Sequence, residues 1–158
     1  MGASEVKLDT VTRKLRADGV LATHGRGPYA HDVTSEEAAK VFIAYMGSSK
    51  AAFAASRLNA LASIISKESG KNLLQAVTDL LTDESLCSNI SIVRVSRRSD
   101  RATLIYLNGM VESFCSSTAL DSKLIGTEGF MTGDVFRTIR LLLGEESPAR
   151  RKRSKVVR

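Results

Sequence analysis

The stretch ISIVRVSRRSDRATLIYLNGMVESFC, residues 90–115, decides the fold class. Its β-branched residues alternate with polar ones, and turn-forming residues interrupt it at Arg97–Asp100 and at Asn108-Gly109. Asn-Gly between two alternating segments is a strong signal for a tight hairpin. The stretch therefore predicts an antiparallel meander of three strands, at 90–97, 102–107 and 110–115.

The residues on both sides of this meander have helical patterns. Thr34–Glu37 fits a capping box, in which the two end residues satisfy each other's free amides, and it begins a helix that ends at Gly47. Apolar spacing predicts three more helices, at about 49–69, 72–82 and 134–143. The last of these would be built on Val135, Phe136, Ile139, Leu142 and Leu143. Helices around an antiparallel meander predict an α+β fold.

A short basic helix is expected near the start of the chain, at residues 9–18. Asp9 or Thr10 would cap it and Gly19 would end it. Leu8, Val11 and Leu15 fall near one face of this helix. The candidate nucleic-acid-binding side chains of this helix lie largely away from that face. They are Thr12, Arg13, Lys14 and Arg16.

The segment after this helix predicts a hairpin with the tip HGRGP, residues 24–28. Arg26 lies there between two glycines, which let the backbone approach a ligand closely. An ordinary tight hairpin with an exposed arginine is the alternative interpretation.

The positive charge of the chain is concentrated at its end. The formal net charge is +6, and six of the 23 basic residues lie in the last ten positions; removing those six leaves 17 basic and 17 acidic residues. We expect the tail, residues 145–158, to be disordered and suited to binding polyanions, with a solubilising terminus as the alternative. Its basic residues are Arg150, Arg151, Lys152, Arg153, Lys155 and Arg158.

The first turn of the meander is also basic. Arg97 and Arg98 lie in it, Arg94 and Arg101 flank it, and Asp100 is its one acid. Arginine donates hydrogen bonds to phosphates and to guanine edges, so these side chains are candidates for nucleic-acid binding. Charges that protect a strand from aggregation explain them equally well.

Signatures of an enzyme or a metal site are weak. The stretch GRGPYA, residues 25–30, fits G-x-G-x-x-A, but the dinucleotide fingerprint requires a strand before it and a helix opening on it. The two histidines, His24 and His31, have no zinc-finger spacing to Cys87 and Cys115. We therefore expect no enzyme, cofactor or metal, and two reduced core cysteines. Five Phe, three Tyr and no Trp argue against binding bases or sugars through stacked rings.

The run VTRKLRADGVLATHGRGPYAHDVTSEEAAKVFIAYM, residues 11–46, resembles the recognition helix, wing and following helix of winged helix-turn-helix proteins. It is especially similar to small ones encoded in bacterial prophages. The later IVRVSRRSDRATLIYL also resembles their C-terminal hairpin. The resemblance implies that Thr12, Arg13, Lys14 and Arg16 face the major groove and that Arg26 sits in the wing.

Together these observations predict a DNA-binding protein, a prophage-type transcriptional regulator. Its parts would be a winged-helix-like segment at 1–47, a helical and β-meander body at 48–144 and the basic tail at 145–158. The pattern does not distinguish DNA from RNA. We expect a cytoplasmic homodimer that does not enter a membrane, with the helix at 49–69 as an interface or as core. A small terminase-like or architectural DNA-binding subunit and a protein–protein adaptor with a basic tail are the alternatives.

Overall fold

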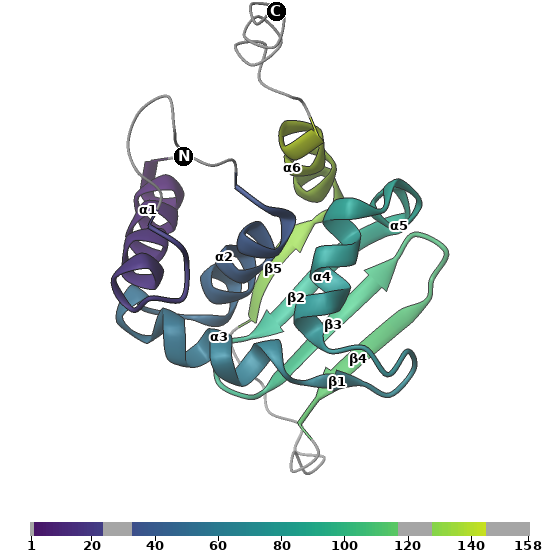
Figure 1. Cartoon of the computed structure of the whole chain (residues 1–158). Helices are drawn as coiled ribbons and strands as arrows, with labels where there is room; N and C mark the ends of the chain where they lie inside the picture. Colours follow the sequence, from purple (N-terminus) through teal and green to yellow (C-terminus); the bar gives the residue numbers. More distant parts are fainter. Residues whose placement is uncertain (1, 24–32, 117–127, 145–158) are drawn as a thin grey trace, which may run out of the picture.

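The computed structural model describes residues 2–23, 33–116 and 128–144 (Figure 1). Within these ranges the chain forms a two-layer α+β fold, as predicted: a layer of helices packs on one face of a five-stranded antiparallel sheet. The strands are β1 (Ile65–Ser66), β2 (Ile90–Ser96), β3 (Arg101–Tyr106), β4 (Val111–Cys115) and β5 (Glu128–Thr132), in the spatial order β1-β4-β3-β2-β5. The predicted meander is β2-β3-β4, and the Asn108-Gly109 turn joins its last two strands.

Helix α2 (Ser35–Gly47) lies at the centre of the helical layer. The predicted capping box is present, with Glu37 N donating to Thr34 Oγ1 and Thr34 N donating to a Glu37 carboxylate oxygen. Ile43 and Ala44 are fully buried, and α2 contacts β2 and β5 in the sheet as well as the helices around it. The ring of Phe42 packs edge-on against Phe136, with 6.0 Å between centroids.

The remaining helices surround α2. They are α1 (Gly2–Ala17), the short 3-10 helix η1 (Ala51–Phe53), α3 (Ala54–Ala62), α4 (Leu73–Thr82), α5 (Glu84–Asn89) and α6 (Gly133–Gly144). Helix α4 matches the predicted helix at 72–82, and Asn72 caps it through a box with Gln75. None of the helices in the described ranges is both long and apolar enough to span a bilayer.

The predicted start of the first helix was wrong. Helix α1 begins at Gly2, so Asp9 and Thr10 lie inside it and do not cap it. Thr10 Oγ1 instead donates to Val6 O one turn back, 2.7 Å away. The predicted end is confirmed, since Gly19 has a φ of 71° and Val20 N donates to Leu15 O. The hairpin expected next lies mostly outside the described residues, because 24–32 are not described.

The prediction of a single helix at about 49–69 was also wrong. The helical segment there is η1 followed by α3 and ends at Ala62, after which Ile65 pairs with Cys115 as part of β1. Ile65 is 54% exposed and lies on no buried helix face. The buried face of α3 consists of Ala54, Leu58 and Leu61, which belong to the core. These three residues are therefore not available to form an interface with a second copy.

Three further elements differ from expectation. Strand β5 and helix α5 were not predicted, and α6 buries less than its pattern indicated. Phe136 is fully buried, but Leu142 is 68% exposed and Val135 39%. Helix α6 contacts β2, β5, α4 and α5, and Phe136 is its one large side chain that is fully buried, so Val135 and Leu142 lie away from the core.

The outer edge of β4 is held by side chains of the loop between β1 and α4. A Glu68 carboxylate oxygen accepts a hydrogen bond from Ser113 N, and this bond lowers the pKa of Glu68 below its ordinary value. Glu112 accepts from Ser69 Oγ and from Tyr106 Oη, the latter at 3.0 Å. Burial, reinforced by the Glu112 charge, raises the pKa of Tyr106 to about 12.

The Tyr106 phenol gives a prediction for alkaline pH. An unfolded tyrosine loses its proton near pH 10, whereas folded Tyr106 keeps it until about pH 12. The free energy of unfolding should therefore fall as the pH rises from 10 to 12, and Tyr106→Phe should remove that share of the loss. Denaturant unfolding of both proteins across this range measures the difference. Identical pH slopes for the two proteins would contradict the assignment.

Close packing of β5 against α2 gives a second prediction. A Cβ at Gly129 would collide with the carbonyl oxygen of Met46, which is main chain and cannot rotate away. We expect Gly129→Ala to lower the free energy of unfolding by about 2 kcal/mol. The control Ser113→Ala, at an exposed strand position, should change it by less than about 0.5 kcal/mol. Urea unfolding tests both, and a Gly129→Ala protein as stable as the control would show that β5 does not lie this close to α2.

Candidate nucleic-acid interface

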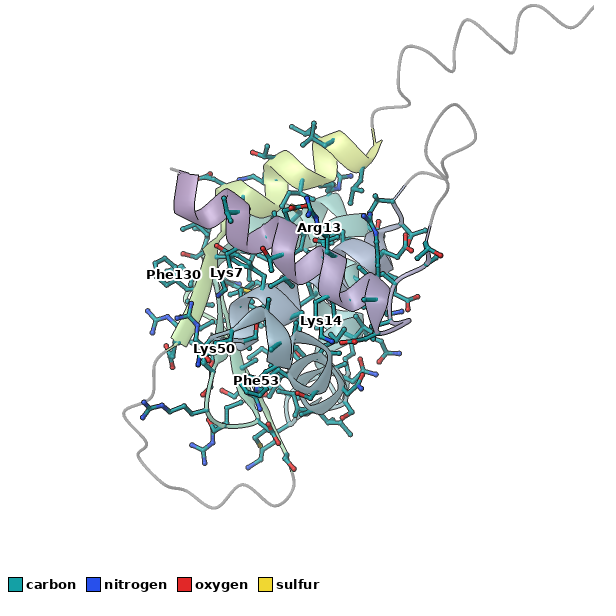
Figure 2. The ribbon with its side chains drawn as sticks, turned by 90° about the vertical axis from the view of Figure 1, so that its left-hand side faces the viewer. Lys7, Arg13, Lys14, Lys50, Phe53 and Phe130 are labelled. Atoms are coloured by element: carbon teal, nitrogen blue, oxygen red, sulfur yellow. The ribbon has the colours of Figure 1, made fainter. Side chains whose placement is uncertain are left out.

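The outer face of α1 presents the basic residues predicted from the sequence. Val11 and Leu15 are fully buried against α2, α3 and η1. Arg13 and Arg16, three positions apart, are both exposed on the opposite side, and Figure 2 shows Arg13 on the helix that faces the viewer. Lys14 is partly exposed beside them. Thr12 is half-buried, and its hydroxyl donates to Leu8 O at 2.9 Å.

Two of these cations form ion pairs along the helix. An Arg13 guanidinium nitrogen lies 2.8 Å from Asp9 Oδ2, and Lys14 Nζ lies 2.7 Å from Asp18 Oδ1. The Arg13 side chain is 77% exposed even so. Exposed pairs of this kind contribute little to stability, because water screens them and both side chains lose conformational entropy. Either cation can therefore exchange its carboxylate for a phosphate at small cost.

A second group of cations meets at the C-terminal end of α2. Lys7 Nζ donates to Tyr45 O and Ser48 O, at 3.3 and 2.9 Å, and also lies 4.8 Å from the centre of the Tyr45 ring. Arg97 Nε donates to Met46 O at 3.2 Å. A helix ends with carbonyls that lack partners, and cations satisfy them and match the negative end of the helix dipole. Burial, together with the charge of Arg97, lowers the pKa of Lys7.

Arg57 of α3 joins this group to the turn between β2 and β3. Its guanidinium donates to Gly47 O, to Asp100 Oδ1 at 2.8 Å, and to the carbonyls of Ser96 and Ser99 at 3.0 Å each. Only 19% of the Arg57 side chain is exposed. Arg57 therefore holds the turn in one conformation against the end of α2.

The neighbouring arginines of that turn differ in their surroundings. Arg97 is half-buried by its contact with α2, so its position is explained by helix capping. Arg98 is exposed, and its main-chain nitrogen donates to Ser96 Oγ. From the sequence, both residues were candidates for nucleic-acid binding. Of the two, only Arg98 has a side chain that projects from the molecule.

Lys50 lies at the same end of the molecule and was not predicted from the sequence as a site residue. It directly precedes η1, which contacts α1, and it is exposed together with Phe53. Figure 2 shows Lys50 and Phe53 on the face that also carries Arg13 and Lys14. A single lysine between Ser49 and Ala51 gives no pattern in the sequence, so only the packing of η1 against α1 shows this placement.

We use the name basic end for the exposed or partly exposed cations of α1, of the residue before η1 and of the β2–β3 turn: Arg13, Lys14, Arg16, Lys50 and Arg98. Acidic residues lie beside these cations as well as elsewhere in the described chain. Asp9 and Asp18 are on α1 and Asp100 is in the β2–β3 turn, whereas the β1–α4 loop, α4, the start of α5 and β4 carry Glu68, Asp79, Asp83, Glu84 and Glu112.

Several predicted site residues lie outside the described residues. These are Arg26, in the expected wing, and the tail residues Arg150, Arg151, Lys152, Arg153 and Lys155. The described residues place Arg13, Lys14 and Arg16 on the outer side of α1 and Arg98 in the β2–β3 turn. Thr12 and Arg97 lie next to them in the chain in more buried positions.

The described residues also line a pocket of about 540 Å³ at the far edge of the sheet. Its walls come from the end of α3, β1, the end of β4 and the β2–β3 turn, and they include Ser63, Lys67, Asp100 and the free thiol of Cys115. No histidine is among the lining residues that are described. The described ranges contain no group of three or more His, Cys, Asp or Glu placed to hold a metal ion.

Comparison with known proteins found no match to this chain among protein-family models, curated proteins or solved structures.

The Arg57 contacts give a prediction for stability. Arg57→Met keeps most of the aliphatic stem but removes the bonds to Asp100 and to the carbonyls of Ser96 and Ser99. We expect a loss of about 2 kcal/mol in the free energy of unfolding, because partners of a mostly buried charge lose their bonds. Thermal unfolding followed by circular dichroism measures it. The control Lys50→Met, at an exposed position, should leave the melting temperature unchanged, and equal melting temperatures for both variants would show that Arg57 does not anchor the turn.

Proposed function

We propose that the protein binds double-stranded DNA through its basic end. The observation that carries this proposal is the exposed basic face of α1. Arg13 and Arg16 lie on its outer side, and Figure 2 shows Lys14 and Lys50 on the same face of the molecule as Arg13. Phosphates supply most of the affinity in protein–DNA contacts, and exposed Arg and Lys are their usual partners.

The geometry of α1 suits a contact with the DNA backbone. Arg13 and Arg16 project from the same face of a helix that is fixed to the body by Val11, Leu15 and Lys7. A rigid helix presents its cations without a further loss of backbone entropy on binding. The tail adds six basic residues, and its contribution is electrostatic and independent of base sequence.

The resemblance to winged helix-turn-helix proteins extends the proposal to a transcriptional regulator. One short helix covers little DNA, so we propose that the protein acts as a homodimer whose two copies contact successive half-sites. Packaging or architectural roles use the same phosphate contacts and predict larger assemblies, which light scattering distinguishes from a dimer.

The proposal predicts the behaviour of a matched pair of charge reversals. Arg16→Glu changes the basic end, whereas Lys67→Glu makes the same change in charge at an exposed position of the β1–α4 loop. We expect Arg16→Glu to weaken binding to random-sequence duplex about ten-fold and to lower the slope of log K against log salt by about one. Arg13→Ala should act in the same direction, and Lys67→Glu should have only a small effect.

Fluorescence anisotropy across a salt series measures these quantities for the full chain and for a protein that ends at Pro148. The comparison separates the tail from the body. If Arg16→Glu and Lys67→Glu weaken binding equally, the tail and the net charge account for the affinity. The basic end is then not a DNA-binding surface, and the interpretation as an adaptor gains support.

A further inference from the structure

The face of the sheet opposite the helical layer carries a row of polar and aromatic side chains. In the described ranges all helices lie on the other face (Figure 1). Strand alternation and register place Ser113, Thr103, Arg94 and Phe130 in line across β4, β3, β2 and β5. Arg94 is paired with Thr103 on one side and with Phe130 on the other. A guanidinium and a ring therefore stand on adjacent strands, with two hydroxyls beside them.

Phe130 is unusually accessible for a phenylalanine in a sheet. It is 67% exposed, whereas Phe114 and Phe136 are at most 1% exposed. Arg94 is exposed as well. The neighbours of Arg94 along β2, Val93 and Val95, are fully buried beneath the helices, so the alternation directs Arg94 outward.

The rows on either side of this one differ in character. One row is apolar and consists of Val111, Ile105 and Ile92, with Thr132 at its end. The other contains Cys115 and Arg101, and Glu128 follows on β5 at the same end. Arg98 projects from the turn just beyond it. The face therefore has an apolar side and a charged side, which carries Arg101, Arg98 and Glu128, with the Arg94–Phe130 pair between them.

We propose that this sheet face binds single-stranded nucleic acid. Bases stack on aromatic rings and on guanidinium planes, and Phe130 and Arg94 offer one of each on neighbouring strands. The hydroxyls of Thr103 and Ser113 are placed to bond base edges or sugars, and the cations Arg98 and Arg101 complement phosphates.

The arrangement selects single strands over duplex because paired bases keep their flat faces inside the double helix, where Phe130 cannot reach them. The proposed sheet site shares Arg98 with the basic end and uses no residue of α1. The scarcity of aromatic residues in the sequence argues against stacking in general. In the structure, however, one of the five phenylalanines, Phe130, is exposed and lies beside Arg94, and this pair can stack with bases.

The test is anisotropy binding of the full chain to labelled oligothymidine and oligouridine, over a salt series. Phe130→Ala should weaken binding by about ten-fold or more at high salt, where the contribution of the basic tail is screened and stacking persists. Phe130→Trp should retain or strengthen binding. The matched control is Phe53→Ala, which removes a ring that is 54% exposed on η1, in the helical layer. Circular dichroism confirms that each variant is folded.

Photo-crosslinking with a halogenated-uracil oligonucleotide gives a readout that does not depend on affinity, and we expect the crosslinked peptide to contain Phe130. Equal single-strand affinities for Phe130→Ala and Phe53→Ala would overturn the proposal. So would a change in oligomeric state on Phe130→Ala without a change in affinity, since the face would then be a contact between copies. Loss of duplex binding alone in Arg16→Glu supports both proposals, whereas loss of single-strand binding in that variant contradicts a separate sheet site.

Discussion

The end of α2 is the point on which the arrangement of the molecule depends. Lys7 from α1, Arg57 from α3 and Arg97 from the β2–β3 turn donate to the last carbonyls of this helix. Carbonyls at a helix end need partners, and the partners here come from three elements that are distant in sequence. These bonds therefore fix the first helix, the helical layer and the sheet relative to one another.

The same contacts divide the basic residues into two groups. Lys7, Arg57 and Arg97 hold the structure, and their positive charge is directed into the protein. Arg98 follows Arg97 in the chain, and Arg13 lies on the helix that Lys7 anchors, so the first group positions the exposed one. Total charge would not separate these roles, because it counts a cation at a helix end and a cation on the surface equally.

Local patterns predicted the Thr34–Glu37 capping box, the Asn108-Gly109 turn and the β2-β3-β4 meander, because each depends on residues close together in the chain. The prediction of a long helix at 49–69 was wrong because Ile65 pairs with Cys115. This contact joins residues distant in the chain, and a helical pattern carries no sign of it. Strand β5 was missed for a similar reason, since Gly129 reads as a loop residue and is required by the approach of Met46.

For the candidate site, the sequence indicated the basic strip of α1 but gave no signal for Lys50, and it could not distinguish Arg97 from Arg98. Those distinctions depend on which cations meet the end of α2 and on how η1 packs against α1. Burial decides whether a charge is structural or available to a ligand, and burial follows from contacts between elements that are far apart in the chain.

The most direct measurement is a titration of the isotope-labelled full chain with a short duplex, followed by amide chemical shifts in NMR spectra. If the basic end binds the duplex, shifts should concentrate on the outer face of α1, at Lys50 and at Arg98, and α4 and α5 should be unaffected. Shifts confined to the tail, or spread evenly over the acidic elements, would contradict the claim that the basic end is the surface that meets DNA.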